Sequence, residues 1–147
     1  MREVLTSARA SRRPRTVVVL ESRPGGEGRT LARELRRVGL VVELIPDREG
    51  ASRVSRADLL LIGADSIFAD GSVLHKAKTR SLALAAQRAG VPVVVAAGTA
   101  KFVRYRRPVR RVSSWFDRTP ARAIREYWTD RGRIPRSAWV RRSRAFR

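Results

Sequence analysis

Cysteine is absent from the chain of 147 residues. This absence excludes disulfides, thiolate metal sites and cysteine nucleophiles together. Asparagine is absent too, and Gln87 and Met1 are the single glutamine and methionine. Scarcity of these labile residues is typical of a thermophilic or archaeal source, although a GC-rich genome also favours arginine codons.

Long apolar runs are also missing. No stretch approaches the ~20 apolar residues that a membrane-spanning helix needs, and the basic N-terminal segment contains no continuous apolar part of the kind found in secretory signals. We therefore expect a cytoplasmic protein with no membrane partner.

Motifs for cofactors and metals are weak or absent. His75 is the only histidine and has no companion ligands at metal spacing, so neither a zinc site nor a serine-type triad is expected. Gly26–Leu31 begins like a dinucleotide fingerprint but lacks its third glycine, and no P-loop lysine motif occurs. This pattern is typical of a tight turn into a helix, and we expect no cofactor and no metal.

Positive charge is the most unusual property that the chain does have. Lysine and arginine total 33 against 13 acidic residues, for a net charge of +20. That excess is beyond what solubility requires and implies a polyanionic partner. Residues 1–15 carry +4, residues 16–100 carry +3 and residues 101–147 carry +13. The middle is thus an ordinary globular sequence between two basic ends.

Strand-like and helix-like segments alternate in the first two thirds of the chain. The strands are predicted at Thr16–Leu20, Val41–Ile45, Leu59–Ile62 and Val91–Ala97. Helices are predicted over about 29–38 and 78–88, and another over about 121–128 with Ile124 and Trp128 facing inward. The alternation predicts right-handed βαβ units and an α/β fold with a Rossmann-like, doubly wound parallel sheet.

Ligands of such sheets bind beyond the carboxyl ends of the strands. Polar segments follow all four predicted strands, at Glu21–Gly26, Asp47, Asp65–Asp70 and Gly98–Lys101. The sequence therefore predicts one shared rim, where Arg23, Lys76 and Lys101 are candidates to hold a phosphate.

Several blocks of sequence resemble the C-terminal domain of the translation initiation factor 2B α/β/δ family, which includes methylthioribose-1-phosphate isomerase and ribose-1,5-bisphosphate isomerase. The blocks, in the family's order, are ESRPGGEG (21–28), IGADSIFADGSVLHKAKT (62–79), GVPVVVAAGTAKF (90–102) and the closing FDRTPARAIREYWTDRGRIP (116–135). The resemblance implies one domain over residues 16–139, with a basic N-terminal tail (1–15), a basic C-terminal tail (140–147) and an Arg-rich extended segment (103–114) within the domain.

Two departures from the family bear on catalysis. The resemblance implies that isomerases use a cysteine from a separate N-terminal domain with an aspartate that corresponds to Asp65. This chain has no cysteine, and we expect it to lack a counterpart of that domain. HKAKT stands where the family usually reads NKIGT, which places Lys78 in a glycine position. We therefore expect no isomerase activity. Asp65 is interpreted as a vestigial carboxylate that holds loop N–H groups, or else as a group that binds a ligand hydroxyl.

Arginine outnumbers lysine thirty to three. Guanidinium groups bind phosphate in a bidentate manner and stack on bases, which suits structured RNA. The alternative is a solvated charged surface, which the local density of like charges disfavours. The predicted RNA-binding residues are Lys101, Arg104, Tyr105, Arg106, Arg107, Arg110, Arg111, Arg136, Trp139, Arg141, Arg142, Arg144 and Arg147.

Together these features predict a non-catalytic RNA-binding protein of the translation machinery, with ribosomal RNA and neighbouring ribosomal proteins as partners. The alternative is a phosphosugar- or nucleotide-binding subunit of an initiation factor 2B-like or sugar-phosphate isomerase complex. The resemblance also allows a homodimer, because the family's C-terminal domains associate with one another.

Overall fold

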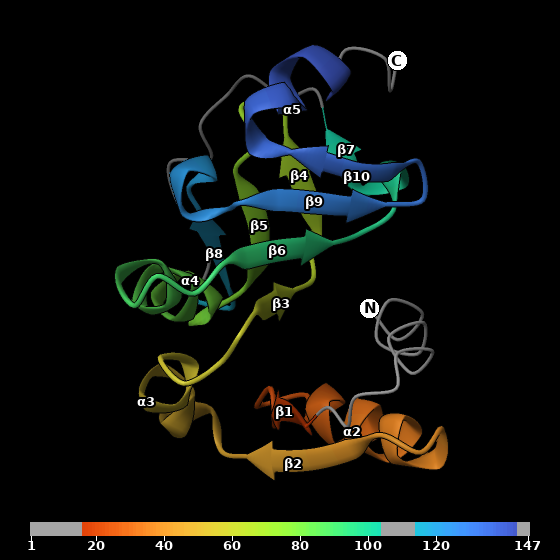
Figure 1. Cartoon of the computed structure of the whole chain (residues 1–147), viewed down its shortest axis with the longest axis vertical. Helices are drawn as coiled ribbons and strands as arrows, with labels where there is room; N and C mark the ends of the chain where they lie inside the picture. Colours follow the sequence, from red (N-terminus) through yellow and green to blue (C-terminus); the bar gives the residue numbers. More distant parts are fainter. Residues whose placement is uncertain (1–15, 104–113, 144–147) are drawn as a thin grey trace. The chain divides into compact units, whose positions relative to one another are not determined.

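A computed structural model describes residues 16–103 and 114–143 (Figure 1). They fall into two compact units, divided in the sequence after Arg53. Within the described residues, no helix is long and apolar enough to cross a membrane. The predicted N-terminal tail (1–15), residues 144–147 of the predicted C-terminal tail (140–147) and most of the Arg-rich segment (103–114) lie outside the described residues.

The first unit is a strand–helix–strand element. Strands β1 (Thr16–Leu20) and β2 (Val41–Ile45) pair in parallel, and helix α2 (Glu27–Arg37) connects them. Its core is apolar and comprises the buried Val19, Ala32 and Leu35 with the partly buried Val17, Leu31, Leu40, Val42 and Leu44. Helix α2 starts directly against β1, since a Cβ at Gly28 would lie 1.7 Å from the Leu20 carbonyl oxygen. A 3-10 turn (Asp47–Glu49) and the short helix α3 (Gly50–Val54) follow β2.

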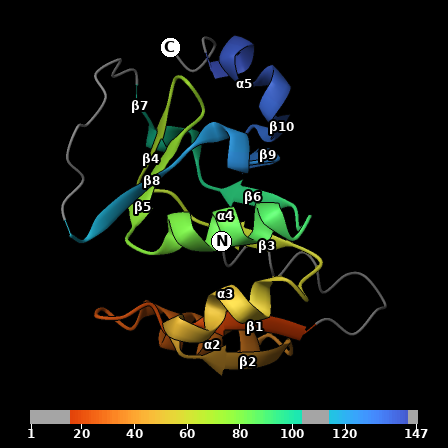
Figure 2. The same ribbon diagram turned by 90° about the vertical axis from the view of Figure 1, so that its left-hand side faces the viewer.

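The second unit contains two four-stranded sheets (Figure 1). In the first, β3 (Leu60–Ile62), β6 (Val93–Ala96) and β9 (Glu126–Thr129) are parallel neighbours, and β10 (Gly132–Pro135) pairs antiparallel with β9. The order in the second is β7 (Phe102–Val103), β4 (Ser66–Phe68), β5 (Val73–Lys76), β8 (Phe116–Thr119). Helix α4 (Thr79–Arg88) contacts β3, β6 and β8 (Figure 2), and α5 (Arg136–Ser143) follows β10.

The core of the second unit forms around Trp139 of α5. Trp139 is 1% exposed, and its indole N–H donates to the carbonyl oxygen of Phe68 at 3.0 Å. Its ring centroid lies 4.1 Å from that of Tyr127 on β9. The Tyr127 hydroxyl donates to the carbonyl of Gly71, whose φ of +82° gives the tight turn between β4 and β5.

These observations confirm the α/β class and several predicted elements. The strands at 16–20 and 41–45 are confirmed at both ends, and the predicted helices at 29–38 and 78–88 correspond to α2 and α4. The described strands pair within three sheets, two of them with mixed strand directions, so a single doubly wound parallel sheet stays a prediction.

Two predictions for the C-terminal part are wrong. The segment 121–128 is not a helix: a 3-10 turn (Ala121–Ala123) leads into β9, because Tyr127 alternates inward between Glu126 and Trp128 as strand geometry requires. The second wrong prediction is that Trp139 binds RNA. It is a core residue whose single polar group is already satisfied inside the protein.

Candidate functional site

The loop after β1 is held by Asp47. Its carboxylate accepts hydrogen bonds from the backbone N–H groups of Ser22 and Arg23, each at 2.8 Å, so the segments after β1 and β2 meet as predicted. Arg23 and Arg29 both pair with Glu21, at 2.9 and 2.7 Å. The hydrogen bond from Arg23 is the main reason that the pKa of Glu21 is lowered. Arg23, a predicted phosphate ligand, thus has a carboxylate partner in the first unit.

Asp65, Lys76 and Lys101 gather at one end of the second sheet. Strands β4 and β7 pair with Ile67 opposite Phe102, so Asp65 and Lys101 lie just before neighbouring strands. The backbone N–H of Asp65 donates to the Leu74 carbonyl on β5, immediately before His75 and Lys76. The structure therefore brings together three of the residues that sequence reasoning singled out.

The role predicted for Asp65 belongs to other carboxylates. Loop or turn N–H groups donate to Asp47, Asp70 and Asp130, and an N–H group in the first turn of α4 donates to Asp117. Asp65 is exposed, and its carboxylate forms no hydrogen bond with the residues that the structure describes. It interacts electrostatically with His75. The reading of Asp65 as a group that holds loop N–H groups is therefore wrong, and its side chain faces solvent.

His75 is buried beside this end of the sheet and bonded through both ring nitrogens. Nε2 lies 2.7 Å from the Thr119 hydroxyl and Nδ1 lies 2.9 Å from the Asp117 carboxylate. Burial lowers the pKa of His75, more than the Asp117 charge raises it. A neutral ring then donates through Nδ1 to Asp117 and accepts from Thr119.

This trio has the connectivity of a serine-type triad, but Thr119 is fully buried and cannot reach a substrate. Asp117 also accepts from the backbone N–H of Arg80, at 3.2 Å to each carboxylate oxygen. The trio therefore ties β5, β8 and the start of α4 together. Among the described residues, no group of three or more potential ligands is arranged for a metal ion.

The predicted RNA-binding residues differ in exposure, and most of them lie outside the described residues. Lys101, Arg136 and Arg141 are exposed, whereas Trp139 is buried. Arg142 belongs to α5. The others lie outside the described residues: Arg104, Tyr105, Arg106, Arg107, Arg110, Arg111, Arg144 and Arg147.

Sequence reasoning missed Asp117, Thr119 and the exposed pair Trp115 and Phe116. The alternation of Asp117 and Thr119 along a short polar strand was the available signal for their shared face.

Comparison with known proteins gives the family. The model of the initiation factor 2 subunit family matches residues 1–108. The chain belongs to this family. It is 34% identical over 146 residues to a putative translation initiation factor eIF-2B subunit 2-like protein of Pyrococcus furiosus, covering 90% of this chain and 53% of that one. It is 46% identical over 84 residues to ribose 1,5-bisphosphate isomerase of Haloterrigena turkmenica, covering 57% of this chain and 26% of the relative.

Solved structures of the family have the same fold. The translation initiation factor eIF-2B of Pyrococcus horikoshii superimposes with a TM-score of 0.80 at 33% identity, covering 91% of this chain and 54% of that one. The eIF-2B delta subunit of A. fulgidus gives a TM-score of 0.83 at 24% identity, covering 98% and 50%, and shows the likeness of fold alone. The chain thus spans about half the length of these structures.

Protonation of His75 is expected to weaken the fold. The unfolded histidine has a pKa of about 6.5, and the folded value is lower, so the unfolded state binds the proton first as the pH falls. Stability is therefore complete above the unfolded pKa and declines below it, by up to about 1.4 kcal/mol per pH unit until the folded pKa is reached. Urea unfolding at about pH 7.5 and 5.5 measures this difference.

His75→Gln is the matched control for this prediction, since the chain has no other histidine. The variant should be less stable near neutral pH but should lose the decline between those two pH values. If the free energy of unfolding falls equally with pH in the wild-type chain and the variant, the decline comes from carboxylates and the prediction is contradicted.

Proposed function

We propose that the chain is a non-catalytic, ligand-binding subunit of an initiation factor 2B-like assembly, and that its ligand is a phosphorylated sugar or nucleotide. The observation that carries this proposal is the exposed pair of Asp65 and Lys101 at one end of the second sheet. The fold likeness to the P. horikoshii factor, at 33% identity over most of this chain, supports it.

The pair suits a ligand that contains both hydroxyl and phosphate groups. A carboxylate accepts hydrogen bonds from sugar hydroxyls, and a lysine ammonium group binds phosphate oxygens. Within the part of the chain that the structure describes, Lys101 forms no ion pair with a carboxylate, so its charge is available to a ligand. Since the chain contains no cysteine, the proton transfers of the isomerases lack one of their two groups here.

Titration calorimetry with ribose 1,5-bisphosphate, methylthioribose-1-phosphate and AMP tests the ligand. Lys101→Ala is expected to weaken binding by about tenfold or more, because it removes a charged hydrogen bond. Arg122→Ala is the matched control, since Arg122 is likewise an exposed cation in a 3-10 turn. None of the three compounds should be turned over by the chain. Turnover that disappears in Asp65→Asn, or equal loss of affinity in both cation variants, would contradict the proposal.

RNA binding is a second candidate, favoured by one observation: the net charge of +13 on residues 101–147. A polyanion neutralises such a density, and arginine suits phosphate and base contacts alike. RNA of the ribosome is the polyanion closest to a translation factor family. We infer that the exposed Lys101, Arg136 and Arg141 contribute to this surface with the arginines of the 104–111 segment.

RNA affinity should fall steeply with salt, because each neutralised phosphate releases counterions. If about half of the basic residues after Ala100 reach phosphates, affinity drops by about a thousandfold between roughly 50 and 200 mM salt. Replacing Arg106, Arg107, Arg110 and Arg111 with alanine should weaken co-sedimentation with ribosomal subunits and flatten the slope.

The charge-matched control replaces the exposed Arg33, Arg37, Arg48 and Arg56 instead. This variant should keep most of the affinity. If both variants lose affinity equally, net charge alone explains the binding and no specific RNA surface exists in the basic segment.

A further inference from the structure

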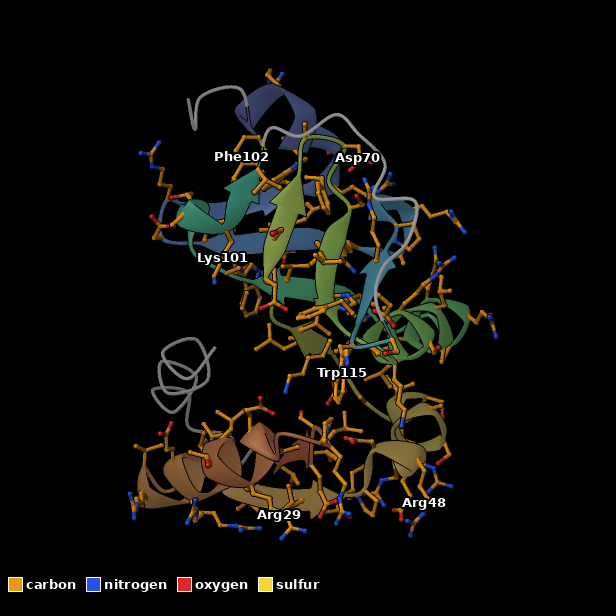
Figure 3. All side chains as sticks on the ribbon, turned by 180° about the vertical axis from the view of Figure 1, so that it is seen from behind. Arg29, Arg48, Asp70, Lys101, Phe102 and Trp115 are labelled. Atoms are coloured by element: carbon orange, nitrogen blue, oxygen red, sulfur yellow. The ribbon has the colours of Figure 1, made fainter. Side chains whose placement is uncertain are left out.

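Two neighbouring aromatic side chains are exposed at the start of β8. Trp115 is 60% exposed and Phe116 is 38% exposed, whereas Tyr127 and Trp139 are buried. The Trp115 carbonyl accepts a hydrogen bond from the backbone N–H of Ala77 at 2.9 Å, which fixes this segment beside the end of β5. Figure 3 shows Trp115 at the end of the second sheet opposite to Asp70. A backbone hydrogen bond thus holds this segment in place, and both side chains are exposed.

Two cations lie at the same place. Lys78 and Arg80 are exposed and follow directly on β5, and the backbone N–H of Arg80 donates to Asp117 of β8 at 3.2 Å. Within the described residues, no carboxylate pairs with the side chain of Lys78 or Arg80. The nearby carboxylate, Asp117, is engaged by His75 and by this backbone N–H. Two exposed cations and two exposed aromatic residues thus lie near the segment that connects β5 to α4.

The surface formed by Lys78, Arg80, Trp115 and Phe116, which we call the aromatic–cationic surface, matches one class of ligand. Anionic membranes and acidic proteins offer charge but no stacked rings, whereas single-stranded RNA offers phosphates and unpaired bases together. The chain's charge of +20 makes a polyanion the complementary partner.

We propose that the aromatic–cationic surface binds single-stranded RNA, with Trp115 and Phe116 stacking on bases and Lys78 and Arg80 contacting phosphates. This proposal rests on the RNA-binding candidate above and assigns a site on the folded domain. Lys78 has a φ of +76°, in the left-handed region where glycine is favoured, so its side chain does not serve the local backbone. Lys78→Gly would remove the conformational strain of the positive φ and the positive charge together.

Fluorescence anisotropy with a labelled oligouridylate of about ten nucleotides tests the site on the full chain. Trp115→Ala is expected to weaken binding about tenfold, since base stacking on one aromatic ring is lost. The pair Lys78→Gly and Arg80→Ala should flatten the salt slope by about 0.7 for each phosphate contact removed. Arg88→Ala is the matched control for Arg80, at the exposed last turn of the same helix, and should leave both affinity and slope unchanged.

Thermal unfolding separates binding from folding. Lys78→Gly should melt no lower than the wild-type chain, so a loss of RNA affinity in this variant cannot come from unfolding. The proposed site is wrong if the four-arginine variant weakens binding of the oligonucleotide while Trp115→Ala and Lys78→Gly do not. In that case the RNA-binding candidate still stands. Absence of RNA binding at low salt would overturn both. Binding to phosphatidylserine vesicles but not to RNA, with the same dependence on Trp115, would overturn the proposal in favour of a membrane surface.

Discussion

The hydrogen bond from the Trp139 indole to the Phe68 carbonyl is the interaction on which the second unit depends. Phe68 belongs to one four-stranded sheet, and Tyr127, whose ring packs on Trp139, belongs to the other. The Tyr127 hydroxyl adds a second link through Gly71 in the turn that joins β4 to β5. A Cβ at Gly71 would approach this hydroxyl to 2.6 Å and the Trp139 ring to 3.1 Å, so the turn has no room for a side chain. These contacts fix β4 and β5, and both strands lead to the candidate site at their other end.

At that end, charged groups divide into those that hold the fold and those that face solvent. Asp117 is bound by His75 and the Arg80 N–H, and Asp130 is bound by the N–H and hydroxyl of Thr99. The backbone hydrogen bond from Thr99 is the main cause of the lowered pKa of Asp130. The side chains of Asp65 and Lys101 have no such role, because neither side chain forms a hydrogen bond or ion pair with another described residue.

The sequence predicted most of the part that is built from regular, strongly apolar segments. The β-branched runs of β1 and β2 and the amphipathic face of α2 are local signals, and they appear where periodicity places them. Strands β4, β5 and β8 were missed because each has only three or four residues, and none has the alternation of apolar and polar residues that indicates a strand. For segment 121–128 the sequence predicts a helix wrongly, because over so short a length the spacing of its buried residues fits the period of a helix as well as that of a strand.

The site could be predicted only in part, because short local segments do not reveal which side chains become buried. The order of polar segments after strands was enough to group Asp65 with Lys101. Local sequence does not distinguish Trp115 from Trp139, since each stands among basic and small residues near the C-terminal part of the chain. Their burial differs because Trp139 of α5 lies in the core, while Trp115 precedes β8, which is an edge strand of its sheet. That difference depends on contacts between residues more than fifty positions apart.

The central claim is that Trp139 is a buried structural residue whereas Trp115 is an exposed one. Urea unfolding of Trp139→Ala and Trp115→Ala tests this claim most directly. Trp139→Ala removes a buried ring and its hydrogen bond to the Phe68 carbonyl, so it should lower the free energy of unfolding by about 3–5 kcal/mol. Trp115→Ala changes an exposed side chain and should alter it by no more than about 0.5 kcal/mol. Equal losses of stability in the two variants, or a larger loss for Trp115→Ala, would contradict the account.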